Sequence, residues 1–103
     1  MALPLTQRTK VATEVRRYVF NFIARSEVIA GETLSSPTVT VSPSGPTISG
    51  AAVLTSALAG VPSGKGVSAT ISGGTPGTTY TLTCTVTTSG GSTLVCKGEL
   101  EVV

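Results

Sequence analysis

Two cysteines, Cys84 and Cys96, are the most reactive side chains of this sequence. A thiolate can act as a nucleophile, ligate a metal ion or form a disulfide. The sequence contains no histidine, so no imidazole base can activate either thiol, and two cysteines alone do not make a structural zinc site. Two alternatives are open: both residues are small buried thiols, or they form a disulfide between neighbouring strands, where the geometry is often strained.

The other polar residues show no catalytic pattern. The acids are five widely spaced glutamates, which do not suggest the carboxylate pair of a glycosidase. The segment GVPSGKG, residues 60–66, lacks the spacing of a phosphate-binding loop and the Ser or Thr that follows its lysine. We therefore expect no catalytic, cofactor-binding or metal-binding residues, and we predict that the protein is not an enzyme.

The composition predicts strands joined by tight turns. The 103 residues suit one domain, charged residues make up only 12%, and Gly, Ser, Thr and Val dominate. β-Branched side chains favour strands, whereas glycine favours turns. No apolar run reaches the roughly 18 residues of a membrane span, and the first ten residues do not resemble a secretory signal. A net charge of +2 is too small to imply a nucleic-acid partner, and we expect neither nucleic acid nor a membrane as a partner.

The most regular pattern lies near the C-terminus. In GGTPGTTYTLTCTVTTSGG, residues 73–91, threonines alternate with larger apolar side chains between two glycine pairs. A turn centred on Gly90 places the apolar side chains of this strand and of the last strand on one face. A slip by one residue would turn half of them outward, so burial fixes the register. The predicted neighbours are Val86 with Leu94, Cys84 with Cys96, and Leu82 with Gly98.

Shorter segments alternate in the same way. Tyr18, Phe20 and Phe22 lie on one face of a predicted strand, and we expect them to fill the core, although part of this stripe could dock a partner. Residues 38–41, bracketed by Pro37 and Pro43, and residues 67–72 also alternate, whereas residues 52–59 are ambiguous between helix and short strands. About seven strands predict an all-β fold, an immunoglobulin-like antiparallel β-sandwich over residues 16–103.

Residues 1–15 predict an extended N-terminal arm. The first 25 residues contain five basic residues and one acid, a charge of +4, while the remainder has two bases and four acids, a charge of −2. We expect the arm to be mobile alone and ordered in an assembly, where its cations meet acidic groups on a neighbouring subunit. A solvated tail without a role is the alternative. The candidate partner-binding residues are Leu3, Leu5, Arg8, Lys10, Val11, Arg16 and Arg17.

Three stretches carry a resemblance to a known family. They are YVFNF (residues 18–22), AGETLSSPTVTV (residues 30–41) and, most specifically, ISGGTPGTTYTLTCTVTTSGG (residues 71–91). Over about residues 18–103, the chain resembles small structural proteins of tailed bacteriophages, of the fibre-tail adaptor or neck type. The first of these stretches departs from the family pattern, because Asn21 and Phe22 stand where the family usually has an acid and a tryptophan.

The resemblance implies a virion component that acts as an adaptor in the neck, collar or tail-fibre attachment region. Its partners would be other virion structural proteins, namely ring, tail-tube, fibre or capsid subunits, with several copies per particle. It also implies assembly in the bacterial host cytoplasm, whose reducing conditions favour free thiols at Cys84 and Cys96. The alternatives are a capsid decoration or cement protein, and a surface- or carbohydrate-binding module, which would need exposed aromatic rings.

Overall fold

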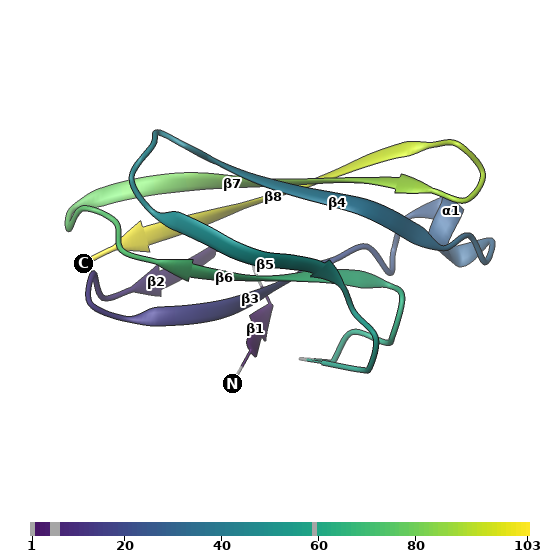
Figure 1. The fold of residues 1–103 in the computed structure, drawn as a ribbon, viewed down its shortest axis with the longest axis horizontal. Helices are drawn as coiled ribbons and strands as arrows, with labels where there is room; N and C mark the ends of the chain where they lie inside the picture. The colour runs from purple at the N-terminus through teal and green to yellow at the C-terminus, as the bar shows by residue number, and fades with distance from the viewer. Residues whose placement is uncertain (1, 5–6, 59) are drawn as a thin grey trace.

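The protein is an all-β sandwich of two four-stranded sheets, which confirms the predicted fold class (Figure 1). The computed structural model describes residues 2–4, 7–58 and 60–103. The strands are β1 (Ala2–Pro4), β2 (Gln7–Lys10), β3 (Val15–Asn21), β4 (Leu34–Ser42), β5 (Thr47–Val53), β6 (Gly66–Ser72), β7 (Thr78–Thr88) and β8 (Thr93–Val102), and a short helix, α1 (Ser26–Ile29), follows β3. The strand order is β1-β3-β6-β5 in the first sheet and β2-β8-β7-β4 in the second. Each sheet therefore joins segments that lie far apart in the sequence.

The β7–β8 hairpin has the register that the sequence predicts. Cys84 lies opposite Cys96, and the pairs Val86 with Leu94 and Leu82 with Gly98 are also confirmed. The turn is held from outside the hairpin. The carboxylate of Glu32 accepts hydrogen bonds from Thr88 Oγ1 and from the Gly90 N–H.

The main core lies between the two sheets. The rings of Tyr18, Phe20 and Phe22 are completely buried there, and Tyr80 is buried as well. The aromatic stripe therefore fills the core, as expected, and its rings are not exposed for contact with a partner. The inward apolar residues of β6, β7 and β8 complete the packing, and they include Ile71, Leu82, Val86 and Leu100.

The strand β4 differs from the prediction at Pro37. It begins at Leu34, as the sequence suggests, but it continues through Pro37 instead of being bracketed by it, with an irregular register between Ser35 and Thr38. β4 is an edge strand, so the backbone N–H groups on its open side have no partner strand. A proline, which has no N–H, can therefore occupy a position on that side. The ambiguous residues 52–59 form no helix where they are described; β5 ends at Val53 and a loop follows.

Tyr80 fixes the connection between β6 and β7. Its hydroxyl oxygen accepts a hydrogen bond from the Thr75 N–H at 2.9 Å. The neighbouring backbone approaches the ring closely, because a Cβ atom added at Gly45 would lie 2.8 Å from the hydroxyl oxygen. This explains why a glycine in the β4–β5 turn accompanies a tyrosine at the start of β7.

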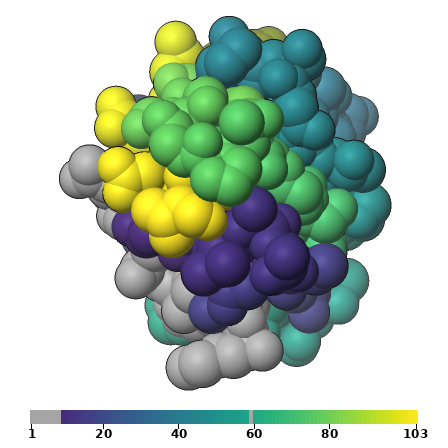
Figure 2. Space-filling view, turned by 90° about the vertical axis from the view of Figure 1, so that its left-hand side faces the viewer, coloured from purple at the N-terminus to yellow at the C-terminus, as the bar shows by residue number. Residues whose placement is uncertain are grey.

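The N-terminal segment extends both sheets. β1 pairs in parallel with β3, and β2 pairs in parallel with β8. The C-terminus closes over the end of β2, since the Val103 N–H donates to the Lys10 carbonyl at 2.8 Å and the Ala12 N–H donates to the Val103 carbonyl at 3.1 Å. An end-on view shows the C-terminal residues beside the residues that follow β2 (Figure 2). The description of residues 1–15 as a separate arm remains a prediction.

Candidate interaction surfaces

Cys84 and Cys96 contribute to packing in this structure. Both are free thiols; Cys84 is completely buried and Cys96 is half-buried. Burial raises the pKa of Cys84 to about 12, and burial also raises the pKa of Cys96. Because the thiolate is the reactive form, neither geometry nor ionisation favours nucleophilic chemistry here. Among residues 2–4, 7–58 and 60–103, no group of three or more possible ligands could hold a metal ion.

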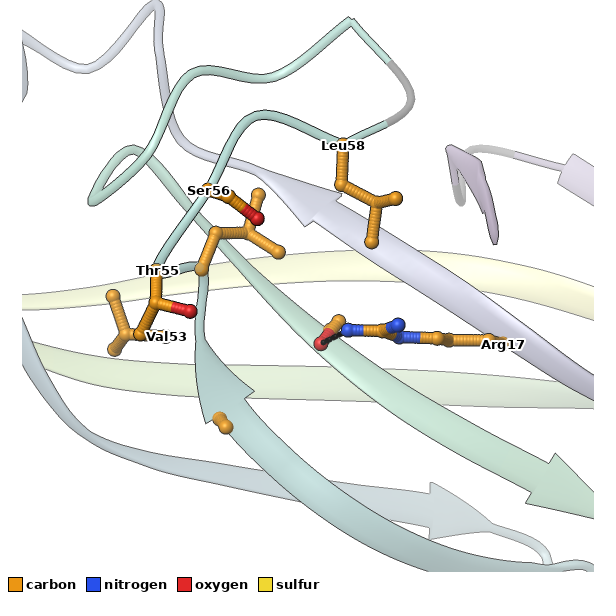
Figure 3. Close-up of a pocket in the computed structure, with 8 residues that line it drawn as sticks. Arg17, Val53, Thr55, Ser56 and Leu58 are labelled. Atoms are coloured by element: carbon orange, nitrogen blue, oxygen red, sulfur yellow. Dashed lines mark hydrogen bonds between the residues drawn. The ribbon is translucent and has the colours of Figure 1, made fainter. Parts of the chain in front are cut away.

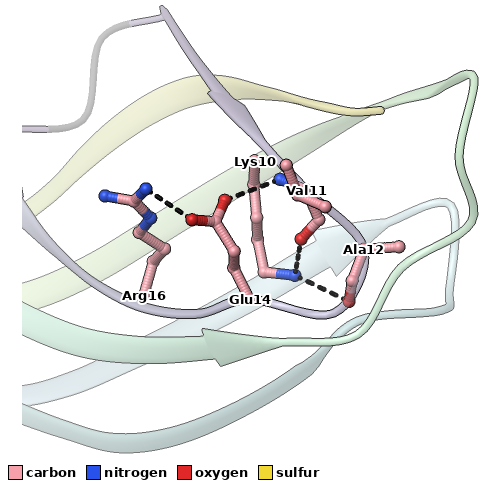
Figure 4. A network of polar contacts seen from close by, with 5 residues as sticks. All are labelled: Lys10, Val11, Ala12, Glu14 and Arg16. Carbon is pink, nitrogen blue, oxygen red and sulfur yellow. Dashed lines mark hydrogen bonds and ion pairs between the residues drawn. The ribbon is translucent and has the colours of Figure 1, made fainter.

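Lys10 lies at the end of the sandwich where the chain passes from β2 to β3. Its side chain is completely buried. The ammonium donates to the carbonyls of Val11 at 3.0 Å, Ala12 at 3.2 Å and Gly73 at 2.7 Å (Figure 4 shows the first two). Lys10 therefore ties the β2–β3 turn to the β6–β7 turn. In this position it presents no cation to a neighbouring subunit, and its pKa is lowered by the burial.

Glu14 and Arg16 form an ion pair on the surface next to Lys10. The Glu14 carboxylate accepts a hydrogen bond from the Val11 N–H at 2.8 Å and another from Arg16 Nη2 at 2.6 Å (Figure 4). The hydrogen bond from Val11, followed by that from Arg16, lowers the pKa of Glu14, while Glu14 raises the pKa of Arg16. The charge of Arg16 is thus already offset within the chain.

The remaining predicted residues lie in different places. Val11 is exposed at the β2–β3 turn, near Lys10 and Arg16. Arg17 lies on the outer face of the first sheet, where its Nη2 donates to Ser68 Oγ at 3.1 Å. Leu3 belongs to β1 and Arg8 to β2, and only their backbone is described; Leu5 lies outside the described residues. The structure therefore gathers three of the seven residues at one end and separates Arg17 from them.

The outer face of the first sheet holds a feature that the sequence reasoning missed. Val19, Leu54 and Val61 form a small second cluster, with Leu58 packed against it. The loop between β5 and β6 closes over β3, and a pocket of about 170 Å³ lies under it beside Arg17 (Figure 3). One signal was present in the sequence. Val19 is apolar at an outward position of a strand whose other face is aromatic, which is typical of a strand buried on both faces.

The edge strands β4 and β5, one in each sheet, are irregular. In β4, Ser36 has a φ of 50° and is followed by Pro37. In β5, Gly50 has a φ of 64° and the register shifts between Ser49 and Ala52. Bulges and prolines disrupt the row of backbone groups that an added strand would use, so these edges are poorly suited to pairing with another chain.

The comparison with known families identifies the chain. No curated protein matches it. The sequence profile of a family described as podophage GP4 fiber-tail adaptor protein gp77 matches residues 10–97. The match runs from the last residue of β2 into β8, so it includes the strands of both faces of the core. The resemblance found in the sequence is confirmed, and the chain belongs to the family of podophage GP4 fiber-tail adaptor proteins, gp77.

Proposed function

We propose that this protein is an adaptor in the neck, collar or tail-fibre attachment region of a tailed bacteriophage. The observation that carries the proposal is the family match over residues 10–97, which spans most of the sandwich. The matched residues form the packed β-sandwich. The function that we propose for it is to hold two virion components in a fixed arrangement. Its partners are other virion structural proteins, and it is present in several copies per particle.

We further propose that the sandwich is immunoglobulin-like. The orders β3-β6-β5 and β8-β7-β4 correspond to strands B-E-D and G-F-C of immunoglobulin domains. Tyr80 supports this relation, because immunoglobulin folds place a tyrosine near the start of strand F with its hydroxyl bonded to backbone a few residues upstream, as Tyr80 is to Thr75. The parallel pairing of β1 with β3 departs from a purely antiparallel sandwich.

The N-terminal segment is the proposed tether. Its candidate contacts are Leu3, Leu5, Arg8, Val11, Arg16 and Arg17, whereas Lys10 anchors the segment within its own chain. β1 is short and pairs only with β3 at the edge of the first sheet, so an exchange of this pairing for pairing with a neighbour would leave β2 and Lys10 in place. A partner that competes for Arg16 would have to replace its ion pair with Glu14.

The alternative functions have less support. A carbohydrate-binding module stacks sugars on exposed rings, but all four aromatic side chains of this sequence are buried. A capsid decoration protein differs from an adaptor in its location and copy number. Assembly in the reducing cytoplasm of the host agrees with the free thiols of Cys84 and Cys96.

The test is complementation of a phage that lacks the protein, with localisation by cryo-EM of the particle. Wild-type protein is expected at the junction of tail and fibres, in the copy number of a ring. Density distributed over the capsid lattice would overturn the proposal in favour of decoration.

The tether is tested with a deletion of residues 1–6, which spares β2 and Lys10, and with Arg8→Glu. Both variants should fold, as judged by circular dichroism and thermal melting, yet incorporate poorly. Lys97→Ala, an exposed change on the outer face of the second sheet, is the matched control and should incorporate normally. Normal copy number for both N-terminal variants would show that the segment is not the tether.

A further inference from the structure

The pocket on the outer face of the first sheet combines one cation with hydroxyl and apolar groups. It has a volume of about 170 Å³, below the roughly 300–1,000 Å³ of sites for drug-sized ligands. A pocket of this size suits a single side chain. Figure 3 shows the Arg17 side chain extending along the sheet, with Leu58 above it and Thr55 and Val53 across the pocket. The eight lining residues are Arg17, Ala52, Val53, Leu54, Thr55, Ser56, Leu58 and Ser68.

The wall of the pocket is held in place by hydrogen bonds at both ends of the loop. The Leu54 N–H donates to the Gly66 carbonyl at 2.9 Å, and the Gly64 N–H donates to the Leu54 carbonyl at 2.8 Å. Leu58 and Val61 exchange two further backbone bonds, of 3.0 and 2.9 Å. The buried side chains of Leu54 and Val61 then fix this loop on Val19. The pocket is therefore formed before any ligand arrives, which reduces the entropy cost of binding.

The electrostatics of the pocket favour an anion. Arg17 is the one charged residue among the eight, and none of them is acidic. A guanidinium remains charged and has five N–H donors, of which one is used in the hydrogen bond to Ser68 Oγ. Among the residues whose side chains are described, the one ion pair joins Arg16 to Glu14, so none of their carboxylates lies within ion-pairing distance of Arg17.

We propose that this pocket binds a carboxylate side chain, Asp or Glu, of a neighbouring virion protein. A planar guanidinium pairs with a carboxylate through two parallel hydrogen bonds, and the hydroxyls of Thr55 and Ser56 lie among the lining groups that can add a third. Leu58 and Val53 provide apolar contact for the methylene groups of the ligand. A nucleic-acid backbone is a poorer occupant, because its binding needs a row of cations and the pocket has one. The class of partner rests on the proposed adaptor function, whereas the ligand chemistry does not.

The experiment is an NMR titration of the full chain with N-acetylglutamate α-amide, whose one carboxylate is the side chain, and with N-acetylglutamine α-amide as the neutral probe of the same shape. Saturable shifts are expected for the Arg17 side-chain N–H and for the backbone N–H groups of Ala52, Thr55 and Ser68. Arg17 is exposed to solvent, so Arg17→Gln should weaken binding by about twofold to fivefold, as expected for the loss of a solvent-screened ion pair. Lys97→Gln, which removes a charge from the opposite sheet, should leave it unchanged.

Equal shifts with the neutral probe, unchanged binding by Arg17→Gln, or no saturable shift would each overturn the carboxylate site. The spectrum of each variant reports whether it is folded. These results are independent of the cryo-EM location, so the site and the adaptor function can fail separately.

Discussion

The outer faces of the two sheets differ in what covers them. On the second sheet, the outward residues of β7 are threonines, of which Thr81, Thr83 and Thr85 are half-buried by their neighbours on β4 and β8. On the first sheet, a loop covers β3 around Val19 and leaves a pocket beside Arg17. The outward threonines of β7 therefore form a regular surface without charged side chains along this strand. The covered face has a shape and a charge that a particular ligand can recognise, so it is the more selective surface of the two.

The largest expected effect separates the inner and outer faces of the second sheet. Leu82 and Leu100 are completely buried, and replacing either with Ala should lower the free energy of unfolding by about 2–5 kcal/mol. Thr83→Ala, one residue along β7 and facing outward, should cost about 0.5 kcal/mol. Urea denaturation measures both changes. Similar losses at Leu82 and Thr83 would mean that the two faces had been assigned wrongly.

A smaller effect is expected on the covered face of the first sheet. Leu54 is buried in a cluster of a few residues, and the loop around it can partly collapse, so Leu54→Ala should cost about 2 kcal/mol, the low end for this substitution. Hydrogen exchange should accelerate at Leu58, Val61 and Gly64 before it changes in β7. If exchange accelerates equally in both regions, the loop is not a separate unit of stability.

The next effect tests whether the N-terminal segment belongs to the body. Lys10→Met keeps an apolar side chain of similar length but removes the donor to three carbonyls. Leaving these carbonyls without that donor should cost about 1–2 kcal/mol in the free energy of unfolding. Lys97→Met is the exposed control and should be nearly neutral. Equal stability of the Lys10 variant and the wild type would indicate that the three hydrogen bonds of Lys10 do not fasten the N-terminal segment to the body.

The smallest effect at neutral pH concerns Cys84, because it appears only in alkali. Folding raises the pKa of this thiol from an ordinary value of 9.0 to about 12. The unfolded chain loses the proton first, so the stabilisation is fully present below about pH 9 and is lost between about pH 9 and 12. Denaturation at several pH values should give a steeper fall in stability for the wild type than for Cys84→Ala. Parallel curves would contradict the buried neutral thiol; other alkaline groups are common to both proteins.

The sequence predicted the regions in which local alternation and burial agree. In β7 and β8, one pairing register buries all the apolar side chains on the same face, and this register places Cys84 opposite Cys96. The aromatic stripe of β3 was placed correctly for the same reason.

The parts that were missed depend on contacts between distant segments. The sequence around Lys10 suggests a surface cation. Its burial depends on Gly73, which is 63 residues away and supplies one of its hydrogen-bond acceptors. The pocket at Arg17 forms because the loop after β5 folds over β3. The sequence of residues 54–65 has no regular hydrophobic pattern that would predict where this loop lies. The irregular start of β4 depends on its being an edge strand, which the sequence of residues 34–38 alone does not reveal.

The parallel pairing of β2 with β8 has a mechanical consequence. The N-terminal side of β2 and the C-terminal side of β8 lie at opposite ends of their four paired positions, from Gln7–Glu99 to Lys10–Val102. A tension applied between the two ends of the chain acts along both strands in opposite directions, so it shears the pairs together instead of peeling them apart one at a time. The buried Lys10 lies at the end of this clamp and adds resistance to sliding. This pairing geometry therefore favours resistance to tension along the chain.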